Sequence, residues 1–325
     1  MNKCLGCGAF LQNKDSSLEG FVNNLNNKYC ERCFRIAHYN DYILNNKEND
    51  EYLEKIKYIN QTGDLVILTV DFLNIIKFDK LNIQNPVLLV FTKKDLFPRS
   101  VKEEKYLNNI NCNLNVVDTL FVSSKKNYNL DLLYFKINKY KKSKNVYVIG
   151  LTNAGKSTLI NKMLKNYSLN DDDITVSNLP STTLDFLEKS INDELILIDT
   201  PGLLDHGNII FKIDKSLLKK IIPSKEINPI IYQIRCEQSI FVEDILRLDL
   251  PKDNNVIFYM SNSLKIERLY KNSDKLCNLN KYKIKLGDNQ DLVIKGLGFI
   301  KFKFGCMVNL YLMDGVNYFV RDSLV

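Results

Sequence analysis

The stretch that decides the fold of this 325-residue chain is Gly150-Leu151-Thr152-Asn153-Ala154-Gly155-Lys156-Ser157. An apolar run at residues 146–149 precedes it and predicts a strand, and residues 158–164 after it have the composition of a helix. A strand, a glycine-rich turn and a helix in this order form a phosphate-binding loop, because the turn aims backbone N–H groups at phosphate oxygens. The residues predicted to hold a nucleoside triphosphate here are Gly150, Asn153, Ala154, Gly155, Lys156, Ser157 and Thr158.

A second segment of the predicted phosphate site follows the helix. Residues 194–199 predict an apolar strand that ends in Asp199, and Gly202 follows three positions later. An Asp-x-x-Gly turn after a strand can place a carboxylate near Mg²⁺ and a backbone N–H near the terminal phosphate. Thr183 is the candidate switch threonine. We expect Mg²⁺ to be held by Ser157, Thr183 and Asp199, and catalysis to use Lys156, Thr183 and Asn153.

A base-reading motif lies upstream, where Thr92-Lys93-Lys94-Asp95 follows an apolar run at residues 87–91. The Asp95 carboxylate can accept hydrogen bonds from both N1 and N2 of guanine, and adenine offers no such pair of donors. Lys93 can pack its aliphatic stem along the base. Ser123-Ser124-Lys125, after the run at 116–122, supports the same site. Thr92 stands where asparagine is usual, which predicts looser bracing of the phosphate loop. The nucleotide is therefore predicted to be GTP or GDP.

Two pairs of closely spaced cysteines open the chain, Cys4 with Cys7 and, after 22 residues, Cys30 with Cys33. Two such pairs can supply four thiolates to one tetrahedral Zn²⁺, which leaves no position for a catalytic water. The start of the chain lacks the apolar segment of a secretory signal, so we expect a reducing compartment, where metal binding is favoured over disulfides. Four other cysteines are isolated and are predicted to be core thiols: Cys112, Cys236, Cys277 and Cys306.

The order of the nucleotide motifs is unusual, because the base-reading motifs at 92–95 and 123–125 precede the phosphate loop. Strands alternate with helices at residues 48–61 and 130–140, which predicts a doubly wound α/β domain. Cysteine pairs, motif order and a basic C-terminal third together resemble the bacterial YqeH family of circularly permuted GTPases and its organellar relatives. The segment Ile222-Pro223-Ser224-Lys225-Glu226-Ile227-Asn228-Pro229 shares this resemblance.

The resemblance implies three domains and a role in assembly of the small ribosomal subunit. We expect a zinc-binding module at 1–47, a circularly permuted P-loop GTPase domain at 48–210 and a basic α+β domain at 211–325. The implied partner is the small subunit or its rRNA, for a monomer in the bacterial cytoplasm or an organelle, without a membrane contact. A nucleotide-gated RNA-binding protein with negligible turnover is the main alternative. A membrane-remodelling or transport-linked GTPase is disfavoured because no apolar run is long enough to span a membrane.

The C-terminal third carries most of the net charge of +7, since residues 206–325 hold 19 basic and 13 acidic side chains. Residues 281–286 and 300–304 alternate strictly, which places Ile284, Leu286, Phe302 and Phe304 on a core face. The alternating lysines are Lys281, Lys283, Lys285, Lys301 and Lys303. They share the opposite face if both strands belong to one sheet, and such a face suits RNA phosphates. Protection of an edge strand is the alternative. Residues 237–248 fit either a helix or a hairpin.

The expected mechanism follows from one missing side chain. Leu203 occupies the position after Gly202 where Ras-like enzymes carry the glutamine that orients the attacking water. Intrinsic hydrolysis is therefore expected to be slow and to need an ion or a partner. In potassium-activated relatives, an asparagine at the position of Asn153 helps to hold K⁺ against the phosphates; the alternative is that Asn153 only shapes the loop. His206 is the nearest titratable side chain, with solvation as its simplest explanation.

Overall fold

The computed structural model describes residues 3–4, 9–16, 20–31, 49–71, 73, 82–108, 113–151, 153–168, 176–177, 186–200, 202, 207–235, 237–251, 253–270, 275–276 and 278–325. The chain divides into two compact units. The first contains Met1–Lys94 and Cys112–Asp205, and the second contains Asp95–Asn111 and His206–Val325. Residues 95–111 thus group with the second unit, although they lie inside the range 48–210 that the sequence predicted as one domain. Each unit is described by itself.

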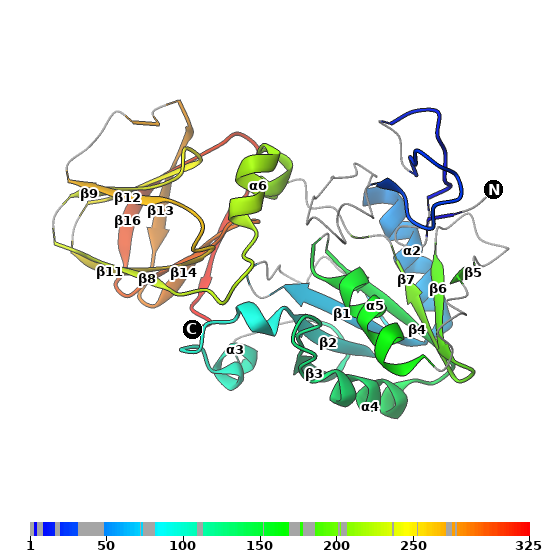
Figure 1. Ribbon diagram of the computed structural model, residues 1–325. Helices are drawn as coiled ribbons and strands as arrows, with labels where there is room; N and C mark the ends of the chain where they lie inside the picture. Colours follow the sequence, from blue (N-terminus) through cyan, green and yellow to red (C-terminus); the bar gives the residue numbers. More distant parts are fainter. Residues whose placement is uncertain are drawn as a thin grey trace. The chain divides into compact units, whose positions relative to one another are not determined.

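The first unit is built on a seven-stranded sheet in the order β3-β2-β1-β4-β7-β6-β5 (Figure 1). Its strands are β1 (Leu65–Asp71), β2 (Val87–Thr92), β3 (Val116–Phe121), β4 (Asn145–Gly150), β5 (Val176–Ser177), β6 (Leu187–Asn192) and β7 (Leu195–Asp199). Neighbours are parallel from β3 to β7, and β6 and β5 are antiparallel. Every residue of β1 and β2 is buried, as expected of central strands covered on both faces.

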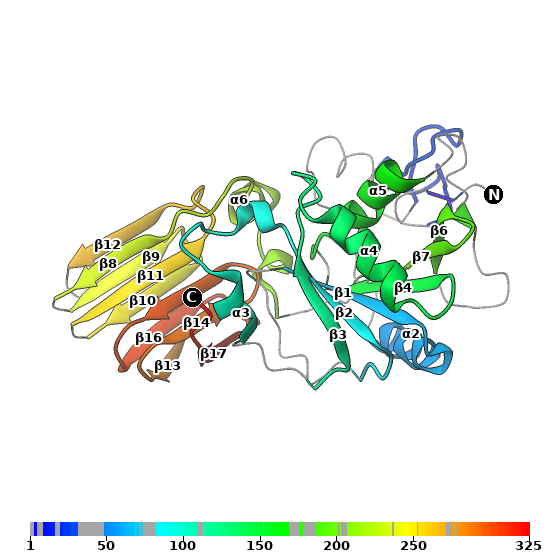
Figure 2. The same ribbon diagram turned by 90° about the horizontal axis from the view of Figure 1, so that it is seen from below.

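Helices cover both faces of this sheet. They are α2 (Asn49–Thr62), α4 (Leu130–Tyr140) and α5 (Lys156–Tyr167). Leu133 and Ile137 of α4 and Ile160 of α5 pack with Ile67 and Val148 in one apolar cluster, so α4 and α5 share a face. Figures 1 and 2 show α2 on the other face. The helix predicted at 130–140 is confirmed, and that predicted at 48–61 is observed one residue later.

The second unit is dominated by two five-stranded antiparallel sheets. Their strands are β8 (Ile230–Ile234), β9 (Gln238–Val242), β10 (Leu246–Leu250), β11 (Asn254–Met260), β12 (Ile266–Tyr270), β13 (Asn280–Leu286), β14 (Gln290–Ile294), β15 (Gly298–Phe302), β16 (Cys306–Leu312) and β17 (Tyr318–Asp322). One sheet has the order β12-β9-β10-β16-β13 and the other β17-β14-β15-β11-β8. Figure 1 shows them as two layers, and contacts between Tyr282 and Tyr318 and between Arg268 and Tyr232 join their edges.

This architecture changes two predictions about the second unit. The α+β expectation understates the strands, because the helices α3 (Glu103–Asn108) and α6 (Lys215–Ile221) are short additions to a core made of sheets. Residues 237–248 belong to the hairpin of β9 and β10, so the helical alternative is wrong. Cys306 is buried and its sulfur accepts a hydrogen bond from Asn254 Nδ2 at 3.2 Å, as a core thiol can. The other three isolated cysteines lie outside the described residues.

The expected common face of five lysines does not form. Lys281, Lys283 and Lys285 lie on β13 in one sheet, whereas Lys301 lies on β15 in the other and Lys303 just follows it. Ile284, Leu286 and Phe302 are buried as predicted, but Phe304 is 48% exposed because β15 ends at Phe302. The alternation in the sequence continues past the end of the strand, and the prediction for Phe304 is therefore wrong.

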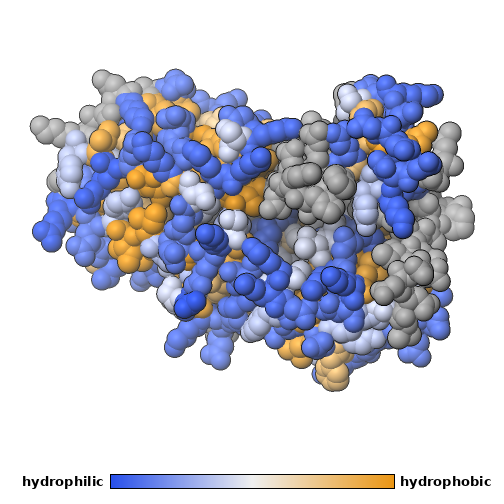
Figure 3. Space-filling view, in the orientation of Figure 1, coloured by the Kyte–Doolittle hydropathy of each residue, from blue (hydrophilic) through white to orange (hydrophobic). Residues whose placement is uncertain are grey.

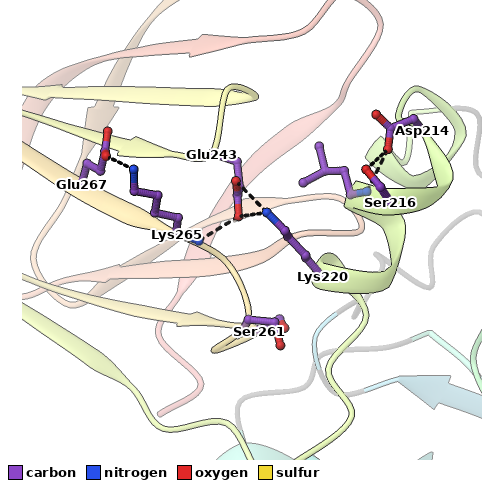
Figure 4. A network of polar contacts seen from close by, with 9 residues as sticks. Asp214, Ser216, Lys220, Glu243, Ser261, Lys265 and Glu267 are labelled. Carbon is purple, nitrogen blue, oxygen red and sulfur yellow. Dashed lines mark hydrogen bonds and ion pairs between the residues drawn. The ribbon is translucent and has the colours of Figure 1, made fainter.

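Helix α6 is fixed to the rest of the second unit by a polar network (Figure 4). Asp214 caps the helix, where its carboxylate accepts the Leu217 N–H at 2.8 Å, and this hydrogen bond lowers the pKa of Asp214. Lys220 pairs with Glu243 at 3.1 Å, and Glu243 also accepts the Lys265 N–H at 2.9 Å. The helix is therefore tied to the turns after β9 and before β12.

Apolar residues on the face drawn in Figure 3 form small patches among hydrophilic ones. No helix in the described part of the chain has both the length and the apolar character needed to cross a membrane.

Candidate nucleotide-binding site

The phosphate loop begins at a close approach between two strands. Gly150 ends β4, and Thr69 of β1 donates a hydrogen bond from its hydroxyl to the Ile149 carbonyl at 3.0 Å. A Cβ atom at position 150 would lie 2.0 Å from Thr69 Oγ1. Only glycine fits there, because any larger residue would separate β1 from β4 where the loop starts. Thr69 is a site residue that sequence reasoning missed.

Two residues with positive φ turn the loop into its helix. Asn153 has φ 65° and Gly155 has φ 81°, the left-handed region that asparagine and glycine enter most easily. Helix α5 then starts at Lys156 and runs for 12 residues, so its N-terminus and its positive dipole end face the predicted phosphates. Ser157 and Thr158 are exposed at this end. The loop therefore has the backbone geometry that the sequence predicted.

Lys156 and Asp199 form a buried ion pair between the start of α5 and the end of β7. The Lys156 side chain is 9% exposed and that of Asp199 is 5% exposed. The prediction placed Lys156 at the phosphates and Asp199 at Mg²⁺. A Mg²⁺-triphosphate offers each group its own partner, a phosphate oxygen for the ammonium and a metal for the carboxylate, so the donor set fits that ligand.

Thr92 braces the phosphate loop. Its hydroxyl oxygen lies 2.5 Å from the carbonyl oxygen of Ala154, in the loop, and 3.2 Å from that of Val70, in β1. The threonine side chain therefore contacts the loop carbonyl directly, although looser bracing than by an asparagine stays a prediction. The end of β2 and the phosphate loop are thus held together by a buried residue of the predicted base-reading motif.

Lys93 makes a contact that the sequence did not reveal. Its backbone has φ 58°, and its Nζ lies 2.7 Å from the Asp71 carboxylate at the end of β1. A Cβ atom at Gly155 would lie 3.9 Å from Lys93 Cε, so the lysine stem runs beside the phosphate loop. Asp71 is the second missed residue. A signal existed, since Asp71 ends an apolar strand as Asp199 does, but β1 carries no recognised motif.

The second base-reading motif joins the first through the backbone. Lys94 donates its N–H to the Val122 carbonyl at 3.0 Å, and the buried Ser123 hydroxyl accepts the Lys126 N–H at 3.1 Å. Ser124 is half-buried and Lys125 is exposed. Asp95 follows Lys94 in the short helical turn η3 (Lys94–Leu96). The Lys94–Val122 bond therefore joins the ends of β2 and β3, where the two base-reading motifs begin.

Some predicted site residues are less completely placed. Gly202 is half-buried after β7, and Thr183, Leu203 and His206 lie outside the described residues. Asn153 Nδ2 is buried and has no hydrogen-bond partner among the described residues. An unpaired buried amide is costly, and this one lies in the phosphate loop, where a ligand would supply the missing partner.

The first cysteine of each N-terminal pair is brought to the same place. Cys4 and Cys30 are buried with Leu11 and Val22, and the Cys30 N–H donates to Cys4 Sγ at 3.1 Å. The Cys4 N–H donates to the Ala9 carbonyl at 2.9 Å, which closes the first turn. Cys7 and Cys33 lie outside the described residues, among which no group of three or more metal-ligating side chains occurs.

Comparisons with known proteins identify the family of the chain. Residues 145–269 match the family model described as 50S ribosome-binding GTPase. YqeH of Bacillus subtilis, described as uncharacterized, is 31% identical over 361 aligned positions that cover 99% of each chain. NO-associated protein 1, chloroplastic/mitochondrial, of Arabidopsis thaliana is 28% identical over 62% of this chain and 44% of its own length. The tRNA modification GTPase MnmE of Borreliella afzelii is 33% identical over 36% of this chain and 25% of its own length. The near full-length match and the GTPase model confirm the resemblance, and the chain belongs to the YqeH family of GTPases.

Proposed function

We propose that this GTPase is a circularly permuted, slowly hydrolysing switch that acts in assembly of the small ribosomal subunit. The observation that carries the proposal is that two groups of motifs meet at the carboxyl ends of β2 and β4, which flank β1 in the sheet. Thr92 of β2 bonds to the phosphate loop after β4, although the base-reading motif precedes the loop in the chain. The matched family model begins at residue 145, downstream of both base-reading motifs. This order supports the permutation.

The chemistry assigned to the site is charge stabilisation. Ser157, Thr183 and Asp199 are the residues proposed to hold Mg²⁺, which would supply positive charge to the phosphates of bound GTP. Lys156 would move from Asp199 to the phosphates. With Leu203 after Gly202, no side chain at that position can orient water, so we expect a slow intrinsic rate.

We further propose that Asn153 takes part in binding K⁺ beside the phosphates. GTP turnover of the natural chain should be about tenfold faster in K⁺ than in Na⁺, which corresponds to ~1.4 kcal/mol in the transition state. Single-turnover hydrolysis in matched chloride salts measures this. The informative pair of variants is Asn153→Ala and Asn153→Gly, because glycine keeps the φ 65° backbone without the amide. K⁺ stimulation that survives in Asn153→Gly would show that the side chain only shapes the loop.

A structural Zn²⁺ is proposed for the N-terminal module. The approach of Cys4 and Cys30 supports it, since an N–H donated to sulfur stabilises a thiolate. Cys7 and Cys33 would complete the four ligands. Metal analysis should find one Zn²⁺ per natural chain and none in a Cys4→Ser, Cys30→Ser variant; a metal-free natural chain contradicts the proposal.

The proposed contact with rRNA is narrowed to strand β13. Lys281, Lys283 and Lys285 are exposed there, and none of the described carboxylates pairs with them. Their cross-strand neighbours on β16 are Tyr311, Asn309 and Met307, which add no negative charge. Lys281 Nζ lies over the Tyr311 ring, 5.5 Å from its centroid, and three exposed cations in a row without a described carboxylate partner suit phosphate contacts. Because β13 is also an edge strand, protection from aggregation remains the alternative.

Sedimentation with purified small ribosomal subunits tests the proposed function. The natural chain should sediment with the subunits more strongly in a non-hydrolysable GTP analogue than in GDP. Replacing Lys281, Lys283 and Lys285 by glutamine should weaken binding and reduce the slope of log K against log salt by about 2 to 3. The matched control is Lys139→Gln, Lys142→Gln, Lys144→Gln, which removes three exposed lysines of the first unit. Equal losses in both variants would contradict a specific role for β13.

The same purified protein and small subunits distinguish the proposed GTPase switch from the alternative function. A nucleotide-gated RNA-binding protein would bind subunits without hydrolysing GTP within the residence time of the complex. Single-turnover hydrolysis with and without small subunits should instead show acceleration by the particle. The proposed location is the bacterial cytoplasm or an organelle; the name of the Arabidopsis relative refers to chloroplasts and mitochondria.

A further inference from the structure

The segment that follows Lys94 in the base-reading motif belongs to the second unit. Asp95–Asn111 is contained in that unit, while Lys94 before it and Cys112 after it belong to the first. Asp95, the residue proposed to read guanine, is the first residue of the segment. Its backbone position therefore depends on what holds the residues just after it.

A loop of the second unit holds them. The Leu96 carbonyl accepts the Ile227 N–H at 3.0 Å, and both residues are buried. Glu226 accepts the Arg99 N–H at 3.3 Å and the Arg99 Nε–H at 3.2 Å. The first of these contacts matters most, because Leu96 is adjacent to Asp95 and its bond is shielded from water, whereas the Arg99 side chain is 92% exposed.

The holding loop is itself firmly attached. Asn228 donates its N–H to Asn262 Oδ1 at 2.8 Å, and Asn262 Nδ2 donates to the Asn228 carbonyl at 2.7 Å. These reciprocal bonds tie the loop to the turn between β11 and β12. Ile227 is 0% exposed, so its side chain anchors the loop in the core as well. The sequence analysis assigned no role to residues 222–229 beyond their family resemblance. In the structure, this segment binds the residues after Asp95 and is itself attached to the second unit.

We propose that Ile227 and Glu226 are positioning residues for guanine recognition by Asp95. The turn Lys94–Leu96 is bonded to Val122 at its first residue and to Ile227 at its last. A carboxylate that accepts two hydrogen bonds from one base edge tolerates little displacement, since hydrogen bonds weaken steeply with angle. This proposal rests on the proposed function of the site. It implies that a ligand that shifts the 226–229 loop changes guanine affinity, and that guanine binding changes the affinity for that ligand equally.

The test compares the affinities of GTP and ITP, because inosine lacks the N2 amino group that Asp95 is proposed to bind. In the natural chain, loss of one hydrogen bond to a charged group should make ITP about 10- to 100-fold weaker. In Ile227→Ala this ratio should fall about tenfold, and Ile227→Val should restore it. The matched control is Ile300→Ala on β15, which removes the same atoms from an equally buried site of the second unit. Displacement of a fluorescent guanine nucleotide measures all four proteins.

Each outcome decides the matter. An unchanged ratio in Ile227→Ala, or an equal fall in Ile300→Ala, would overturn the proposal. If Ile227→Ala does not fold, Glu226→Ala replaces it, and Glu243→Ala is the control because it also removes a paired carboxylate of this unit. A fall in the ratio of GTP to ITP affinity in Glu226→Ala alone supports the proposal. Any other result overturns it. A natural chain that binds GTP and ITP equally would instead contradict guanine reading by Asp95, and with it the proposed function.

Discussion

Lys156→Ala should reduce GTP turnover by about 10³-fold or more, the largest loss expected from any single substitution in this chain. We propose that the side-chain ammonium of Lys156, the only lysine in residues 150–157, binds the outer phosphates of GTP. Its present partner, Asp199, is buried beside it, so the substitution also leaves a buried carboxylate without its cation. Single-turnover hydrolysis and equilibrium binding of GTP measure both consequences.

Two further variants separate the role of Lys156 from general effects of charge. Lys165→Ala removes an exposed lysine from the same helix and should leave turnover unchanged. Lys156→Arg keeps the charge but presents a planar fork instead of a compact ammonium, and it should remain strongly impaired. Turnover within tenfold of the natural rate in Lys156→Ala contradicts the assignment of this lysine to the phosphates.

The second large effect is a change of base. Asp95→Asn should lower the affinity for GTP by about 100-fold or more, because a carboxylate that accepts two hydrogen bonds is replaced by an amide that faces the N2 amino group with a donor of its own. The same variant should bind XTP better than the natural chain does, since xanthine carries a carbonyl oxygen at position 2. Competition of GTP, XTP and ATP against a fluorescent nucleotide gives the three affinities in one experiment.

A matched control tests whether the change in nucleotide affinity of Asp95→Asn comes only from the loss of one negative charge. Asp131→Asn changes an exposed aspartate of α4 by the same single atom and should leave base preference intact. Persistence of the guanine preference in Asp95→Asn would mean that another group reads the base. An Asp95→Asn protein that loses GTP without gaining XTP would mean that the carboxylate supports the turn rather than the base.

Much of the first unit could be predicted because its signals are local. The phosphate loop has positive φ at Asn153 and Gly155, and both residue types enter that region more easily than most others. The strands of the sheet are short apolar runs, and helix α4 follows the 3.6-residue period of Leu130, Leu133 and Ile137. Residues next to one another in the sequence decide each of these features.

The contacts that assemble the site could not be predicted in the same way. Thr69 meets Gly150, Asp71 meets Lys93 and Thr92 meets Ala154, and each pair is separated by more than twenty residues. Only the order of β2, β1 and β4 in the sheet brings them together. The sequence alone could not show whether a threonine at position 92 reaches the loop, because the packing of these strands sets the distance between Thr92 and Ala154.

By itself, the sequence determined the nucleotide class and the membership of the YqeH family, since both depend on residue types at fixed local spacing. Tertiary structure alone decided that β13 and β15 lie in different sheets, which divides the five lysines, and that residues after Asp95 are built into the second unit. The physical reason is the same in both cases. Alternation fixes which face of a strand is apolar, and a motif fixes a turn, but neither specifies which distant segment packs beside it.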